Sequence, residues 1–498
     1  MRRINNGTLF MTKPNILWIC TDQQRWDTLS CLGFPGARTP NIDRLAKKGV
    51  AFRNAYTQSP ICTPSRTTFL TGMYPSAHQV QRNGNDYFPS HLKLVPKIFQ
   101  TAGYHTGLIG KLHLSAAQNR IEPRADDGYN EFYWSQHPQP DWPEGHDYHQ
   151  WLVEKGQDPK ALYAPAEGAV YDGVPTEFHQ TTWAKERALS FIERGKGKPW
   201  FLSINLFDPH PPFDPPKEYM DRFDPAAMPP AIFVPGDLKH QERFSGVDQQ
   251  ARKPVDPTIR HDPSAAANLS GASHDTPPEQ YDAPRIRAAY FAMISLIDDM
   301  VGELMASLEE TGQARDTLVL FMSDHGEMLA DHGLLYKGCR FYEGLVHVPM
   351  IVSLPGVITE DAVSDALVEL VDLPSTLLEA AGLEIPHQNQ GRSLLRLLKG
   401  ESPLHEHKPY VLSEYYDALK FPGSLGSRGS MYFDGRYKLN VYHDAAAGEL
   451  FDLLEDPNEF EDRWLDPDYA AIKSELMQRH FSAMMMVSGI GPERIADF

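Results

Sequence analysis

Four apolar stretches of this sequence are each followed by polar residues of types that are common in active sites. NILWICT leads into Asp22 and Gln23, YHTGLIG into Lys111 and His113, PWFLSINLF into Asp208 and His210, and TLVLFMS into Asp324 and His325. Each apolar run has the length and composition of a buried strand. In an open parallel sheet the carboxyl ends of the strands lie along one edge, where ligands bind. One polar strand end is ordinary, whereas four together predict a functional site at this edge.

Two of these strand ends could hold a metal ion. Asp22, Gln23 and Asp324 offer the hard oxygen ligands that divalent cations prefer. His325 could add a nitrogen, which favours a metal that tolerates imidazole, such as Mn²⁺. The two carboxylates repel each other, and a cation would offset that repulsion. We predict one divalent ion, Ca²⁺ or Mn²⁺.

The same region gathers positive side chains in an acidic protein. The chain of 498 residues has a formal net charge of -19 at pH 7. That charge argues against nucleic acid and against an anionic membrane surface as partners. Lys111, Lys337 and Arg66 are surplus to the two carboxylates of the predicted metal site. A local cluster of cations in such a chain predicts a small substrate with an anionic group.

The segment PICTPSRTTFLTG places Cys62 just before a predicted helix over residues 65–71, which Gly72 would end. A group there faces the positive end of the helix and its free N–H donors, which would activate a thiolate. A buried structural cysteine is the plainer interpretation. A thiol phosphatase is a third, but its chemistry favours an arginine six positions after the cysteine, whereas Arg66 comes four positions after it.

The elements that would position these residues alternate between strand and helix. Helical patterns cover 182–194 and 286–310, and Gly49 would end another that starts after Thr39. This alternation predicts βαβ units and a mostly parallel sheet covered on both faces. The segment 209–284 is rich in Pro, Asp, Ser and Ala. It predicts a long irregular insertion, either a lid or an oligomer contact.

The chain is long enough for more than one domain. We expect an α/β catalytic domain over residues 12–395 and a smaller α+β subdomain with an antiparallel sheet over 396–484. In the second, MYFDGRYKLNVYHD predicts a hairpin around an Asp-Gly turn, covered by a helix near 469–484. The tail, 485–498, begins with apolar residues that would form a subunit contact, so we expect a homo-oligomer.

Features that would direct the chain to a membrane or out of the cell are lacking in the sequence. No apolar run approaches the length of a transmembrane helix. The first ten residues have no apolar core of a secretory signal, and Met11 is an alternative start to Met1. The four cysteines, Cys20, Cys31, Cys62 and Cys339, are too scattered for a disulfide framework. These observations favour a reducing cytoplasm.

CTPSRTTFLTG, which starts at Cys62, resembles the signature of the type I sulfatases of the alkaline phosphatase superfamily. GYHTGLIGKLH, residues 103–113, is similar to the second signature of that family. The order DQ, CTPSR, GKLH, PHPP, SDHGE, YKG is shared along the chain. The resemblance implies an alkaline-phosphatase-like large domain, with a mainly parallel mixed sheet flanked by helices, and a smaller C-terminal α+β domain.

The resemblance also implies a modified cysteine. A formylglycine-generating enzyme would oxidise Cys62 to Cα-formylglycine during maturation. One hydroxyl of the hydrated aldehyde would attack sulfur, and the second would allow sulfate to be expelled. Arg66 would fix the hydrate through charge-assisted hydrogen bonds. The metal ligands would be Asp22, Gln23, Asp324, His325 and the modified Cys62.

The remaining roles fall to lysine, histidine and asparagine side chains. By the same resemblance, Lys111 and Lys337 would clamp the sulfate oxygens. His113 would be the base that triggers elimination, and His210 would protonate or stabilise the leaving oxygen. Asn83 is a candidate contact to the substrate.

Two positions depart from the commonest family pattern. Gln23 stands where many members carry a second Asp, and His325 where many carry Asn. Both residues occur in a branch that includes phosphonate monoester hydrolases. The phosphonate enzymes of that branch usually lack the Lys-x-His pair formed here by Lys111 and His113, so the pair favours sulfate.

We therefore expect a sulfatase that acts on sulfate monoesters of aryl or small organic alcohols, with measurable promiscuity. The first alternative is a phosphonate monoester or phosphodiester hydrolase on the same scaffold. The second, of another class, is a non-catalytic, metal-stabilised binding protein whose Cys62 remains a thiol.

Overall fold

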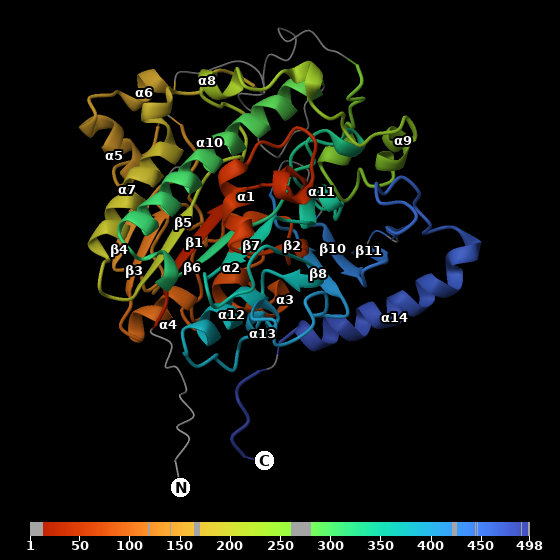
Figure 1. Ribbon diagram of the computed structural model, residues 1–498. Helices are drawn as coiled ribbons and strands as arrows, with labels where there is room; N and C mark the ends of the chain where they lie inside the picture. The colour runs from red at the N-terminus through yellow and green to blue at the C-terminus, as the bar shows by residue number, and fades with distance from the viewer. Residues whose placement is uncertain are drawn as a thin grey trace.

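An eight-stranded sheet runs through the centre of the large domain (Figure 1). Its strand order is β4-β3-β5-β1-β6-β7-β2-β8, and only β7 runs antiparallel to its neighbours. The strands are β1 (Asn15–Thr21), β2 (Gly49–Tyr56), β3 (His105–Gly110), β4 (Glu131–Trp134), β5 (Trp200–Asn205), β6 (Thr317–Ser323), β7 (Met350–Ser353) and β8 (Ala362–Glu369). The computed structural model describes residues 13–117, 120–139, 141–163, 170–259, 280–420, 426–443, 445, 447–489 and 491–496.

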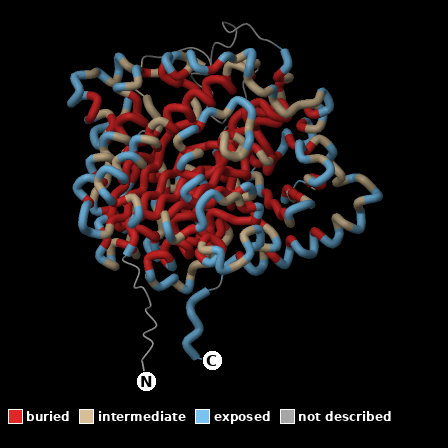
Figure 2. The backbone as a smooth tube through the Cα atoms, in the orientation of Figure 1, coloured by how far each residue is buried: buried red, intermediate tan, exposed pale blue. Residues whose placement is uncertain are grey.

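Helices cover both faces of this sheet, which explains why its strands are apolar throughout. Leu17 and Ile19 of β1 pack in the same cluster as residues of α1 (Pro40–Lys47), α7 (Gln180–Arg194) and α10 (Ala283–Glu310). Ile16 and Trp18 point to the opposite face. They pack in the cluster that contains residues of α2 (Cys62–Thr71), α4 (Val95–Thr101), α12 (Asp372–Ala380) and α13 (Leu395–Leu398). Figure 2 shows the resulting buried interior.

The C-terminal part contains a separate antiparallel sheet of order β12-β11-β10-β9, as expected. Its strands are β9 (Val411–Tyr416), β10 (Arg428–Phe433), β11 (Tyr437–His443) and β12 (Ala447–Asp452). Gly435, with φ of +93°, takes part in the predicted turn between β10 and β11. The helix α14 (Ala470–Val487) packs on this sheet through Leu476 and Ala483. It runs past residue 485, where we expected the tail to begin.

Shorter elements lie between these strands and helices along the chain. They are α3 (Pro75–His78), α5 (Asp147–Glu154), α6 (Pro159–Leu162), α8 (Lys217–Met220), α9 (Gly236–Glu242), α11 (Glu343–Val346) and the 3-10 turns η1 (Trp26–Thr28), η2 (Ser30–Leu32), η3 (Thr176–Phe178), η4 (Pro225–Ala227), η5 (Gln250–Arg252), η6 (Ala314–Asp316), η7 (Asp331–Gly333) and η8 (Pro467–Tyr469). In the described part of the chain, no helix has both the length and the apolar character needed to cross a membrane.

The predicted insertion, 209–284, is short-helical and irregular where it is described. Phe213, Tyr219 and Tyr281 pack in one cluster with residues of α10, so this part belongs to the folded core. Residues 260–279 lie outside the described residues, and a lid or oligomer contact here stays a prediction.

Gly110 joins β3 to the loop that carries Lys111, and its φ is +106°. A Cβ atom there would lie 1.9 Å from the carbonyl oxygen of Asn205 in β5. We expect Gly110→Ala to lower the free energy of unfolding by about 3 kcal/mol, because it adds a backbone clash to a disfavoured conformation. Chemical denaturation of the purified variant measures this loss.

Gly103→Ala is the matched control for this variant. Gly103 also has a positive φ, +89°, but nothing lies within 4 Å of an added Cβ. We expect a loss of only about 1 kcal/mol there. Equal losses in the two variants would contradict the steric argument for Gly110.

Candidate active site

Two pairs of predicted metal ligands lie side by side because their strands are neighbours. β1 and β6 pair in parallel, with Thr21 opposite Ser323, so the residues that follow both strands emerge at one edge. Asp22 and Gln23 follow β1, and Asp324 and His325 follow β6. The backbone N–H of Gln23 donates to Asp324 Oδ1 at 3.1 Å, which ties the two strand ends together.

Cys62 reaches the same edge from the helix α2. We expected this helix to begin at residue 65, whereas it begins at Cys62 itself and ends, as expected, before Gly72, whose φ is +72°. Ser65 Oγ donates to the carbonyl oxygen of Asp324 at 2.6 Å and anchors the first turn. The first turn of α2 is therefore held directly on the end of β6.

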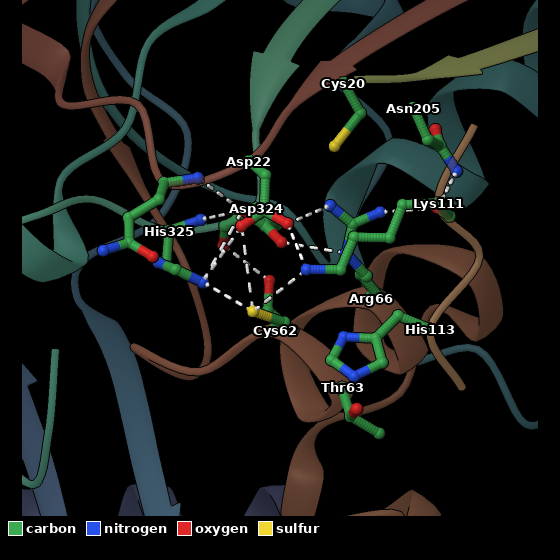
Figure 3. A network of polar contacts seen from close by, with 12 residues as sticks. Cys20, Asp22, Cys62, Thr63, Arg66, Lys111, His113, Asn205, Asp324 and His325 are labelled. Carbon is green, nitrogen blue, oxygen red and sulfur yellow. Dashed lines mark hydrogen bonds and ion pairs between the residues drawn. The ribbon is translucent and has the colours of Figure 1, made fainter. Parts of the chain in front are cut away.

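Four potential ligand atoms from Asp22, Cys62, Asp324 and His325 lie within 4.8 Å of one another, and all four residues are buried. Cys62 Sγ is 3.1 Å from His325 Nε2 and 3.7 Å from Asp22 Oδ1 (Figure 3). Gln23, the fifth expected ligand, presents its Oε1 to Lys337.

The position of Lys337 shows that these donor atoms suit a cation. Its ammonium nitrogen lies 2.8 Å from Gln23 Oε1 and 2.9 Å from Cys62 Sγ. It also lies 3.2 Å from His325 Nε2. One positively charged group thus already touches three of the five expected ligands. Carboxylate, amide and imidazole donors of this kind fit a divalent ion such as Ca²⁺ or Mn²⁺.

Arg66 braces the two carboxylates of the cluster. Its Nε donates to Asp324 Oδ2 at 2.9 Å, and its Nη2 to Asp22 Oδ2 at 3.3 Å. Its Nη1 donates to the carbonyl oxygen of Lys111 at 2.8 Å. The side chain is fully buried, so these partners compensate for its lost hydration. Arg66 thereby connects the ends of β1, β3 and β6.

Lys111 and Lys337 approach Cys62 from two loops. Lys111 Nζ lies 3.7 Å from the sulfur and also pairs with Asp22 Oδ2. Burial and Asp22 oppose ionisation of the thiol, but Lys111, Lys337 and His325 together hold the pKa of Cys62 well below its usual value. Negative charge at this position is therefore stabilised by the site.

His113 lies beside Cys62, Lys111 and Arg66 (Figure 3). Burial and the neighbouring Lys111 lower its pKa from the usual value. Because the ring is neutral at neutral pH, it can accept a proton. Its backbone N–H donates to Glu122 Oε2 at 2.7 Å, which holds the loop after β3.

His210 and Asn83 lie at the margin of the cluster. His210 Nδ1 lies 2.6 Å from the carbonyl oxygen of Pro211. Burial raises the pKa of Asp22, but Lys111, His210 and the other cations hold it well below its usual value. Asn83 Oδ1 accepts the N–H of Thr63 at 3.0 Å in the first turn of α2. In this arrangement Asn83 supports the helix that carries Cys62, and its contact to substrate stays a prediction.

Three supporting residues were not selected from the sequence. Glu327 accepts a hydrogen bond from the Gln23 side chain, and Glu122 accepts the N–H groups of the loop after Lys111. Asn205 donates to the carbonyl oxygen of Lys111 at 2.9 Å. Glu327 stands in SDHGE and could have been found there. Glu122 has no signal in the sequence, because its partners in this loop are backbone N–H groups, which almost any residue type would supply.

Comparison with known protein families and structures identifies relatives of this chain. A family model described as Sulfatase matches residues 14–383. The chain belongs to the sulfatase family. A second model, described as N-sulphoglucosamine sulphohydrolase, C-terminal, matches residues 330–485 of this sulfatase. The two matches together extend over both sheets.

The relatives of this sulfatase-family chain include both sulfatases and a multifunctional protein. An arylsulfatase of Clostridium perfringens is 29% identical over 90% of this chain and 89% of its own. The multifunctional alkaline phosphatase superfamily protein PehA of Trinickia caryophylli is 30% identical over 95% of each chain. Among solved structures, the phosphonate monoester hydrolase of Agrobacterium radiobacter superposes with a TM-score of 0.77 at 25% identity, over 95% of this chain and 96% of that one. The fold is thus that of the alkaline phosphatase superfamily, as expected.

Proposed function

We propose that this sulfatase-family chain hydrolyses sulfate monoesters of aryl or small organic alcohols. The observation that carries the proposal is the pair of lysines on Cys62, with Lys337 at 2.9 Å and Lys111 at 3.7 Å from its sulfur. Two fixed ammonium groups beside the reacting atom suit an ester whose transferring group is anionic. His113, two residues after Lys111, completes the pattern that distinguishes sulfate from phosphonate chemistry in the resemblance above.

The formylglycine derived from Cys62 would supply the nucleophilic hydroxyl, and a divalent ion would act as a Lewis acid beside it. The unmodified side chains of the site would bind the ester and transfer the protons. Lys111 and Lys337 donate to the oxygens of the ester group. His113, neutral because of burial and Lys111, accepts the proton whose removal expels sulfate. His210 donates to the leaving oxygen.

The first alternative is a phosphonate monoester or phosphodiester hydrolase. It is supported by the structural similarity to a phosphonate monoester hydrolase and by Gln23 and His325, which suit both chemistries. Sulfate monoesters, phosphonate monoesters and phosphodiesters each carry one negative charge on the transferring group. Three cations and a metal against two carboxylates could accept either, so charge alone does not decide.

Three expectations about the working enzyme remain part of the proposal. Conversion of Cys62 requires a formylglycine-generating enzyme as a maturation partner. The scattered cysteines favour the cytoplasm. The exposed Phe481 and Met485 on α14 favour a homo-oligomer, which sedimentation of the purified protein would detect.

A panel of nitrophenyl esters separates the two functions. We expect the highest kcat/KM for the sulfate monoester, with measurable turnover of a phosphonate monoester or a phosphodiester, because related transition states fit one site. If a phosphonate or diester wins by an order of magnitude, about 1.4 kcal/mol of transition-state preference, the alternative replaces the proposal.

A variant of the distinguishing residue sharpens this assay. His113→Ala should lower kcat for the sulfate by about 100-fold or more, since it removes the proposed base. The phosphonate rate should fall less, because relatives with that activity are expected to work without this residue. An equal loss for both esters would show that His113 does not set the preference.

A further inference from the structure

Two hydrogen bonds hold the backbone of Gln23 before its side chain is considered. Its N–H donates to Asp324 Oδ1 at 3.1 Å, and its carbonyl oxygen accepts the hydroxyl of Tyr290 at 2.6 Å. Its φ is +68°, a left-handed conformation that a glutamine rarely adopts. The surrounding structure thus holds the amide close to the predicted metal site at the cost of some backbone strain.

The side-chain amide of Gln23 has a defined orientation. Its Nε2 donates to Glu327 Oε2, and its Oε1 accepts from Lys337 Nζ at 2.8 Å. A carboxylate can only accept hydrogen bonds and an ammonium can only donate them. The amide oxygen therefore faces the cluster of ligand atoms, and the NH₂ group faces away from it.

Glu327 is held in place independently of Gln23. It is fully buried, and its second oxygen, Oε1, accepts the backbone N–H groups of Leu329, at 3.0 Å, and Tyr336. Arg25 Nη1 donates to the carbonyl oxygen of Glu327 at 2.9 Å. The side-chain amide of Gln23 and the two backbone N–H groups all donate to the carboxylate of Glu327. Both of its oxygens are therefore needed as acceptors.

We propose that Glu327 is a positioning residue that keeps the amide oxygen of Gln23 turned towards the metal site. Gln23 and Glu327 then form a matched pair, in which a neutral amide can serve as a metal ligand only because a carboxylate behind it binds its NH₂ group. The inference rests on the proposed metal site and goes beyond it, since it assigns a function to a residue outside the ligand set.

The pairing has a specific consequence for Glu327→Gln. The backbone N–H groups of Leu329 and Tyr336 cannot turn, so the new amide oxygen has to face them. Its NH₂ group then faces Gln23, whose amide must rotate to offer its oxygen. That rotation points the NH₂ of Gln23 at Lys337 and at the metal site, where an amide nitrogen is no ligand.

The reverse exchange should repair this defect. In Gln23→Glu alone, two carboxylates face each other in a buried position, which is unfavourable. In the double variant Q23E/E327Q, the amide at position 327 donates to one oxygen of the carboxylate at position 23. The other oxygen is then free to face the metal site. The metal site should therefore bind its ion when positions 23 and 327 are Gln and Glu, or Glu and Gln, but less well when only one of the two residues is exchanged.

Calorimetric titration of the chelator-treated full-length protein with Mn²⁺ tests the pairing. The protein is co-produced with a formylglycine-generating enzyme. We expect Glu327→Gln to weaken Mn²⁺ binding by about 10-fold or more, and Q23E/E327Q to return to within about threefold of the original affinity. Asp298→Asn is the matched control, because Asp298 is also a buried carboxylate that accepts two backbone N–H groups, of Asn41 and Ile42, but does not touch Gln23. It should leave Mn²⁺ affinity unchanged.

Thermal unfolding of the metal-free variants gives a second readout if Glu327→Gln does not fold. We expect Q23E to unfold at a lower temperature than the original protein, and Q23E/E327Q to recover most of the loss. Unchanged Mn²⁺ affinity in Glu327→Gln, or a double variant no better than its two single variants in either readout, would overturn the proposal. Neither readout uses a substrate. A failure of the sulfatase assay therefore does not affect the test of the Gln23–Glu327 pair.

Discussion

Cys62→Ala should abolish turnover of every ester, with kcat lower by about 10⁴-fold or more. The physical reason is that alanine offers no atom for conversion to formylglycine, so both the attacking hydroxyl and the hydroxyl that expels sulfate are lost. The surrounding cations and His113 remain, but they only orient the ester and move protons. Steady-state assays with nitrophenyl sulfate measure the loss, and thermal unfolding verifies that the variant is folded.

Cys62→Ser separates the two hydroxyl roles, provided that the serine is not itself oxidised. A serine could attack once, but its sulfate ester has no second hydroxyl to release it. We expect the intact protein to gain the mass of one sulfuryl group and then stop. Continued turnover by a verified unmodified serine or by Cys62→Ala would refute the formylglycine assignment.

The wild-type protein itself distinguishes an enzyme from a binding protein. A mass spectrum of the peptide containing Cys62 should show an aldehyde in place of the thiol after co-production with the maturation enzyme. A peptide that retains the thiol, in a protein without esterase activity, would favour the non-catalytic alternative.

Asp324→Asn should produce the second large effect, a loss of about 100-fold or more in metal affinity and a matching loss of activity. Asp324 is both an expected ligand and the acceptor for Arg66, at 2.9 Å, and for the N–H of Gln23. The amide of asparagine removes a negative charge that a divalent ion needs. It also places an NH₂ group where Arg66 and the N–H of Gln23 require an acceptor. Calorimetric titration with Mn²⁺ and with Ca²⁺, before and after the substitution, measures the change and ranks the two ions.

Chelation of the native protein is the companion experiment. Activity should disappear in chelator and return with Mn²⁺ or Ca²⁺. Asp208→Asn is the matched variant, since Asp208 is also buried near this edge but its side chain accepts from Thr181, at 2.8 Å, and lies outside the ligand cluster. It should retain metal affinity. Full activity in chelator, in protein without a stoichiometric divalent ion, would exclude the metal.

The apolar runs of this chain predict its strands, and the residues that follow them predict the chemistry at the strand ends. Uninterrupted apolar runs such as NILWICT and TLVLFMS are typical of strands buried on both faces, and β1 and β6 appear where these runs predict them. Parallel strands bring their carboxyl ends to one edge whatever their order, so the sequence predicts that Asp22 and Asp324 lie along the same edge. CTPSR then identified Cys62 and Arg66 through the family resemblance.

Contacts between distant segments of the folded chain set which of these residues touch and what holds them. The antiparallel direction of β7 and the start of α2 at Cys62 depend on contacts with distant segments. Glu327 and Gln23 are 304 residues apart, and Lys337 and Cys62 are 275 apart. Local periodicity reports which face of an element is buried, but it carries no information about which donor meets which acceptor across the fold. The orientation of a single amide in the metal site is therefore a property of the packed structure, because the partners that set it come together only when the sheet and its loops have formed.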